Sequence, residues 1–203
     1  LVFNFIFPIG LRALVIPQSA YELSTSNTGI ADNLSVGINP ASLNMIKSYV
    51  GFSKNNWFGD LQGQKVSIIW NSKTKSFFSF ESLSLNDIEL RNEVASESPI
   101  GFFGVYWYAL DFGKTINFNN DSFKFGYKVK FNLSKLHTES MYGITLDFGM
   151  IKKINQRLDF GIVIKNIGQE FDKNLNAETN PQIGVGISYL VPKINIKLNS
   201  DLI

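Results

Sequence analysis

A strict alternation of apolar and polar residues over residues 122–135 constrains this chain more than any other feature. In the stretch SFKFGYKVKFNLSK, every second residue from Phe123 to Leu133 is aromatic or aliphatic, and the residues between them are lysine, glycine or asparagine. Side chains of a β-strand alternate between its two faces, so the stretch predicts a strand with one apolar and one polar face. The apolar face must contact either a second sheet or lipid.

The same period of two recurs from residue 45 to the end of the chain. The alternating segments are separated by clusters of glycine, asparagine, aspartate, serine and lysine, which mark turns. We count about nine strands in residues 45–203. No apolar run beyond the first residues approaches the ~20 residues that a membrane-spanning helix needs. The sequence therefore predicts an all-β fold, an antiparallel up-and-down meander.

The expected connections between these strands alternate in length. We expect short connections near residues 71–74, 118–121, 152–156 and 192–193, and long ones near 54–63, 83–99 and 167–180. The connection at 135–139 is an exception, because it is short within the long series. Short turns on one rim and long loops on the other are typical of outer-membrane barrels.

Composition helps to choose between lipid and a second sheet. Charged residues make up only 18% of the 203 residues, and phenylalanine occurs 18 times. Several strands reach the ~9 to 11 residues that cross a bilayer at a tilt, and their polar faces are rich in small residues. Aromatic residues are expected near strand ends, where they favour the headgroup level: Trp70, Tyr106, Trp107, Tyr142 and Tyr189. These features favour a transmembrane β-barrel, with a secreted β-sandwich as the alternative.

The barrel interpretation places a set of charged side chains on the inward, polar face. They are Lys124, Lys128, Lys130, Asp147, Asp159 and Lys165. Counting across the hairpin puts Lys128 opposite or diagonal to Asp147, so that the two charges compensate each other. Asp147 and Asp159 each precede an aromatic residue and a glycine inside a strand, which favours structural charges over a pair of catalytic acids.

Several functional classes are disfavoured by composition. The net charge of +2 has no Lys/Arg block, so we expect no nucleic-acid partner. Cysteine is absent and His137 is the only histidine, in an expected loop, so we expect no metal, no cofactor and no catalytic site. We therefore expect a protein that is not an enzyme.

The first residues, LVFNFIFPIGLRALVIPQSA, begin inside an apolar stretch and without an initiator methionine. Residues 1–20 are interpreted as the remnant of a secretory signal peptide and a lead-in, with a buried first strand as the alternative. A signal peptide would direct the protein out of the cytoplasm.

Residues 29–43, GIADNLSVGINPASL, resemble the N-terminal signature of the PorV/PorQ family within the FadL-like outer-membrane proteins. FKFGYKVKFNLSKL, SMYGITLDFGMIKK, LDFGIVIKNIG and NPQIGVGISYLV are similar to successive strands of that family, and the likeness covers about residues 14–202. Asn39, Pro40 and Ala41 match the signature, whereas Ser42 replaces the commoner glycine.

The resemblance implies a barrel of fourteen strands with an N-terminal segment folded inward as a plug. Residues 21–44 would form this plug-like segment, and residues 45–203 would form the barrel. Because we count about nine strands, we expect the barrel to be incomplete in this chain, a fragment of a larger one. The implied location is the outer membrane of a Gram-negative-type bacterium, in contact with membrane lipid.

Two functions compete within that group. The first is a role in protein secretion or cell-surface attachment, with secretion-machinery proteins as partners. The alternative is passive transport of small hydrophobic molecules such as fatty acids, which needs an apolar pocket and a strand with broken pairing. The polar inward faces, and the lack of proline in the expected strand cores, favour the first. A secreted β-sandwich binding protein is the second alternative.

Overall fold

The computed structural model describes residues 16–43, 48–71, 75–91, 97–118, 122–171, 176–179, 181–194 and 196–203. Most of the predicted signal remnant, residues 1–15, therefore lies outside the described residues. The elements are α2 (Ala20–Ser24), β1 (Tyr49–Asn56), η2 (Phe58–Asp60), β2 (Gln62–Trp70), β3 (Lys75–Leu90), β4 (Gly101–Phe118), β5 (Phe123–Leu136), β6 (Glu139–Lys153), β7 (Leu158–Phe171), β8 (Asn176–Glu178), β9 (Gln182–Val191) and β10 (Ile196–Leu202).

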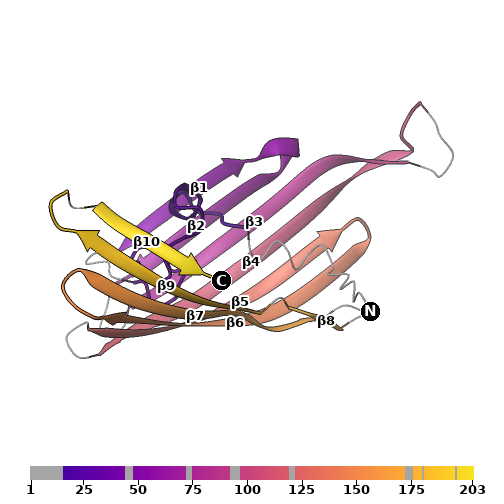
Figure 1. The fold of residues 1–203 in the computed structure, drawn as a ribbon. Helices are drawn as coiled ribbons and strands as arrows, with labels where there is room; N and C mark the ends of the chain where they lie inside the picture. The colour runs from indigo at the N-terminus through magenta and orange to yellow at the C-terminus, as the bar shows by residue number, and fades with distance from the viewer. Residues whose placement is uncertain are drawn as a thin grey trace, which may run out of the picture.

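All described strands belong to one antiparallel sheet. Its order is β1-β2-β3-β4-β5-β6-β7-β9-β10, and the short β8 pairs with β7 beside this path. Nearly every strand therefore pairs with the next one along the chain, as Figure 1 shows. The predicted all-β, up-and-down sheet of nine principal strands is confirmed. The described residues contain no helix that is long and apolar enough to cross a membrane.

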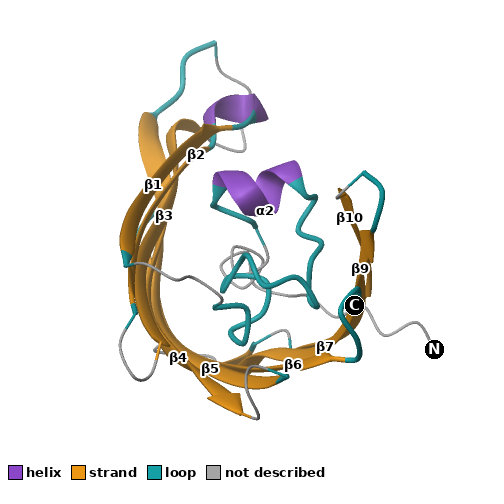
Figure 2. Cartoon of the chain, turned by 90° about the vertical axis from the view of Figure 1, so that its left-hand side faces the viewer, coloured by secondary structure: helices purple, strands orange, loops and turns teal. Residues whose placement is uncertain are grey.

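The sheet curves around the N-terminal segment, residues 16–43, which includes α2. Viewed along the curve, this segment lies on the concave side of the strands (Figure 2). The end strands β1 and β10 do not pair with each other in the described part of the sheet. The architecture is thus barrel-like but not closed.

The two rims of the sheet differ in their connections. One rim carries the connections 71–74, 119–122, 154–157 and 192–195, each four residues long; we call it the short-turn rim. The expected long loops on the other rim are shorter than predicted, because β3 continues to Leu90 and β7 continues to Phe171. A register shift between Leu85 and Ile88, where Asp87 has a φ of 58°, keeps this polar end of β3 paired with β4.

The two faces of the sheet are inverted relative to a water-soluble sheet. On β5, Lys128 is only 3% exposed on the concave face, whereas Phe131 is 51% exposed on the convex face. The same division holds on neighbouring strands, where Ile144 and Ile187 are exposed and Asp147 is buried. The convex face is therefore largely apolar and uncovered, and the concave face is polar and enclosed.

Two aromatic positions were predicted wrongly. Tyr106 and Trp107 were expected near a strand end, but β4 is 18 residues long and both lie well inside it. Trp107 is buried on the concave face, with the Lys130 ammonium 5.5 Å from its ring centre. Trp70, Tyr142 and Tyr189 do lie near strand ends with exposed side chains.

Candidate functional site at the polar concave face

Glycines on the concave face bring the N-terminal segment against the strands. A Cβ atom at Gly126 would overlap the backbone of Pro40, and one at Gly149 would overlap the Asn39 side chain. Gly126 and Gly149 are directly opposite each other on β5 and β6. Close approach of backbone to backbone is therefore possible only because these two positions lack side chains.

Asn39 is the central anchor of this contact. Its amide nitrogen donates to the carbonyl oxygens of Ile30 at 2.7 Å, Ile162 at 3.3 Å and Met150 at 3.4 Å. Its side-chain oxygen accepts from the backbone N–H of Ala41 at 2.9 Å. Asn39 is fully buried, so these bonds satisfy an amide that has no access to water.

The residues beside Asn39 are held in the same way. The Thr115 hydroxyl on β4 donates to the Pro40 carbonyl at 2.7 Å, and Lys165 on β7 donates to the Gly37 carbonyl at 3.0 Å. The Asn39-Pro40-Ala41 motif thus contacts the middle of the sheet from inside the curve. What the structure establishes is this position, and the motif's plug role stays a prediction.

A second anchor joins the segment to the last strand. The Asp201 carboxylate on β10 accepts from the backbone N–H groups of Gly29 at 2.6 Å and Ile30 at 3.0 Å. In return, Asp32 forms an ion pair with Lys197 of β10 at 2.9 Å and accepts from the Tyr21 hydroxyl at 2.8 Å. The segment and β10 are therefore joined by one carboxylate from each side, Asp32 and Asp201.

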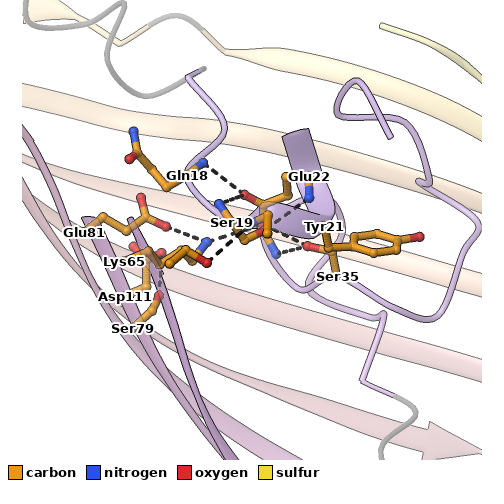
Figure 3. Close-up of polar contacts among 12 residues, drawn as sticks. Gln18, Ser19, Tyr21, Glu22, Ser35, Lys65, Ser79, Glu81 and Asp111 are labelled. Carbon is orange, nitrogen blue, oxygen red and sulfur yellow. Dashed lines mark hydrogen bonds and ion pairs between the residues drawn. The ribbon is translucent and has the colours of Figure 1, made fainter. Parts of the chain in front are cut away.

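A third contact is a buried chain of charges between α2 and the strands (Figure 3). The Lys65 ammonium on β2 lies 3.3 Å from Glu22 and 2.8 Å from Glu81 of β3. Glu81 in turn lies 3.3 Å from Lys130, which is 3.6 Å from Asp111 on β4. All five side chains are nearly inaccessible to solvent, so each charge depends on its neighbours for compensation.

Glu22 also closes the start of α2. Ser19 is the N-cap, and its hydroxyl accepts from the Glu22 N–H while the Glu22 carboxylate accepts from the Ser19 N–H, a capping box. Burial alone would raise the pKa of Glu22, but the Lys65 charge and the hydrogen bonds from Ser19 and Ser35 outweigh it and lower the pKa to about 2. Glu22 is therefore ionised at neutral pH.

The charged residues predicted for the inward face all lie on the concave side. Lys128 is directly opposite Asp147, in the expected position, with a nitrogen-to-oxygen distance of 2.7 Å. Lys124 donates to the Asn33 side chain at 2.8 Å. Asp159 is half-buried and lies 3.5 Å from the Asn33 amide nitrogen. The six residues thus do not form one cluster, because they serve separate contacts along the sheet.

Several residues of this network were missed in the sequence. The buried chain of ion pairs includes Lys65, Glu81 and Asp111. None of these three residues was assigned to the inward face from the sequence. The signal was present for Lys65, which stands between Gly63 and Ser67 at period two on the polar face of β2. Asp111 lies in a run with aromatic residues on both faces, which hides the alternation.

An interruption in the β7 ladder was also unforeseen. β8 and β9 pair with β7 in one common register, since Gln169 faces Glu178 and Lys165 faces Gln182. Between these pairs, the Thr179 hydroxyl bonds the Asn166 carbonyl at 2.6 Å and the Gly168 carbonyl at 3.0 Å. Pro181, which has no N–H group, stands at this point, immediately before β9. Asn166 itself has a φ of 59° and forms a bulge opposite Asp147.

The described residues on the concave side line a small and a larger cavity. The first, about 30 Å³, lies among charged residues that include Glu22, Lys65, Lys128 and Asp147, and has room for about a single water molecule. The second, about 390 Å³, lies near the short-turn rim and includes Lys124 and Asp159 in its lining. Within the described residues, no group of three histidine or acidic side chains is arranged to hold a metal ion.

The chain matches no known family model and no curated protein. The resemblance to the PorV/PorQ family therefore rests on the sequence motifs alone.

Proposed function

We propose that this chain forms part of the wall of a β-barrel in the outer membrane of a Gram-negative-type bacterium. In this proposal, residues 16–43 act as a plug, and the protein serves protein secretion or cell-surface attachment. The proposed role is structural and does not involve catalysis.

The inversion of the two faces is the single observation that carries the membrane assignment. Water-soluble proteins rarely expose apolar patches above a few hundred Å². Here large apolar side chains are exposed on the convex side of strands from β1 to β10, for example Val50 at 71%, Phe131 at 51% and Leu202 at 74%. All described strands lie in one sheet, so no described second sheet covers this face.

The dimensions of the apolar face agree with a bilayer. On β5 the outward apolar residues run from Phe123 to Leu133. Ten residue steps of ~3.4 Å give about 34 Å along the strand, or about 24 Å across the membrane at a tilt of ~45°. This matches the ~25 Å apolar band of outer-membrane barrels.

The filled interior supports a secretion or attachment role over a conducting channel. Residues 16–43 occupy the concave side through Asn39, the Asp201 contacts and the Glu22 ion pair. Both cavities described above are lined mainly by polar and charged residues, whereas a carrier of hydrophobic molecules needs an apolar pocket.

One observation favours the alternative, passive transport of small hydrophobic molecules. The ladder beside β7 is interrupted at Thr179 and Pro181, and such a gap in the wall would offer a lateral exit toward lipid. Uptake of a labelled fatty acid into vesicles containing the protein separates the two roles. Saturable uptake would replace secretion or attachment by transport.

The open edges set a condition on the proposal. An unpaired backbone amide in hydrocarbon costs several kcal/mol, so β1 and β10 must gain pairing partners before the wall can enter a bilayer. Those partners are further strands, a second copy, or each other after further curling.

The membrane assignment is tested by expressing the chain in a bacterium with two membranes and separating the membranes on a density gradient. We expect the chain in the outer-membrane fraction, resistant to carbonate extraction. Val129→Lys places a charge near the middle of the apolar band, which should cost roughly 2–4 kcal/mol and reduce insertion, while Val129→Ile should insert normally. Recovery of a folded monomer in the soluble fraction would refute the assignment.

A further inference from the structure

We propose that the 390 Å³ cavity near the short-turn rim binds the phosphate group of a small phosphorylated molecule or of a phospholipid headgroup. Lys124, Lys153, Arg157 and Lys197 contribute four cations to its lining, against the single carboxylate of Asp159. Its volume falls in the range of pockets that hold small organic ligands.

The cations converge from separate elements. Lys124 comes from β5, Lys153 from the end of β6, Arg157 from the turn between β6 and β7, and Lys197 from β10. Folding therefore concentrates charges that are spread over more than 70 positions of a chain whose net charge is only +2. A cavity lined by one sign of charge focuses its field on ions of the opposite sign.

Two of these cations are fixed in place by the N-terminal segment. Lys124 donates to the Asn33 side chain at 2.8 Å, and Lys197 pairs with Asp32 at 2.9 Å. Lys153 and Arg157 are exposed at the mouth of the cavity, and no ion pair to the described residues is formed by either.

The charge balance favours an anion. Among the described lining residues, four cations face the single carboxylate of Asp159, and Asp32 outside the lining pairs with Lys197, so the described residues leave an excess of positive charge. The charge-compensated ion pairs elsewhere on the concave face, such as Lys128 with Asp147, leave no comparable excess.

The donor set specifies phosphate. An arginine guanidinium offers paired N–H groups that match phosphate oxygens, and lysine adds point charges. The Gln156 amide and the buried Ser188 hydroxyl, also in the lining, supply neutral donors. A phosphoryl group fills only part of the volume, so the ligand carries an organic body that contacts Ile151 and Leu190 on the cavity wall.

The experiment is calorimetric titration of the purified chain in a nonionic detergent. Pyrophosphate probes a free phosphate, and dihexanoyl phosphatidylglycerol probes a headgroup, with dihexanoyl phosphatidylcholine as the zwitterionic comparison. We expect saturable binding of pyrophosphate, of the anionic lipid, or of both, weakening as salt is raised. Saturation by the lipid alone identifies a headgroup, and saturation by pyrophosphate identifies a phosphorylated small molecule.

Two double variants with the same loss of charge decide whether the cavity is the site. Lys153→Gln with Arg157→Gln removes two cations from the mouth and should weaken binding at least roughly tenfold. Lys152→Gln with Lys193→Gln removes two exposed cations from the same rim but outside the cavity, and should change affinity less than about twofold. All four side chains are exposed, so matching circular dichroism spectra are expected.

The proposal is overturned if none of the probes saturates, if phosphatidylcholine binds as tightly as the anionic lipid, or if both double variants weaken binding equally. Binding is measured in detergent and does not depend on where the protein resides in the cell. Its failure is thus distinguishable from failure of the proposed membrane function.

Discussion

Removing one partner of the buried pair between Lys128 and Asp147 should destabilise the fold strongly, whereas removing both charges together should not. The two side chains are only 3% and 2% exposed, and their charged atoms are 2.7 Å apart. At an effective dielectric constant of about 20, this distance gives a gross attraction of about 6 kcal/mol, which is offset by the cost of removing both ions from water.

Lys128→Met leaves the Asp147 carboxylate without its ion-pair partner, and Asp147→Asn leaves the Lys128 ammonium in the same state. Each single variant should lower the free energy of unfolding by about 3–5 kcal/mol. The double variant should lie within about 1 kcal/mol of the parent, because both charges of the ion pair are removed together. Asparagine at position 147 retains the oxygen that accepts from the Asn166 N–H at 2.7 Å.

The measurement is urea unfolding in detergent micelles, followed by tryptophan fluorescence. The four proteins form a double-mutant cycle whose coupling energy should be at least about 5 kcal/mol. Lys152→Met, at an exposed lysine on the convex face of β6, is the control and should cost less than about 0.5 kcal/mol. A coupling energy below about 1 kcal/mol would mean that water enters the concave side and screens the pair, which would refute the enclosed polar interior.

Two further predictions concern the attachment of the N-terminal segment. Gly126→Ala should displace this segment, because the added Cβ overlaps the Pro40 backbone. Limited proteolysis should then cut residues 16–43 faster. Gly101→Ala, whose Cβ would have no atom within 4 Å, is the control and should leave the cutting rate unchanged. Because the pKa of Glu22 is about 2 when folded and 4.5 otherwise, its stabilising contribution of about 3 kcal/mol is complete above pH 4.5 and is lost as the pH falls toward 2. Protease sensitivity of the segment should rise over that interval in the parent. In Glu22→Gln it should already be raised at pH 4.5 and should depend less on pH.

The period-two pattern was sufficient to predict the sheet and its faces. On β5 it correctly placed the lysines and the phenylalanines on different faces of the strand. It also predicted that Lys128 of β5 lies across from Asp147 of β6, because strand pairing across a two-residue turn is a local property of the sequence. The pattern failed on β4, where Trp107 stands between two tyrosines. Because both faces carry apolar residues there, the alternation does not show which face is the concave one.

Other features depend on contacts that no local pattern encodes. The bulges at Asp87 and Asn166 require a positive φ, which asparagine and aspartate tolerate, but these residue types also occur in most turns of this chain. The role of Glu22 could not be predicted, because its partner Lys65 lies 43 residues away on the inside of the curve. Gly126 and Gly149 were interpreted as small interior residues, and only the structure shows that a chain segment lies against them.

The bonds from Gly29 and Ile30 to Asp201 have a consequence for the order of folding. They join groups 172 and 171 positions apart, whereas the strands pair almost entirely with their neighbours in sequence. Hairpins close quickly because their loops are short, and contacts at large sequence separation form late. In a chain that emerges N-terminus first, the N–H groups of residues 29 and 30 cannot form these bonds until β10 has joined the sheet. The time at which these two amides become protected from hydrogen exchange should therefore report when the sheet is complete.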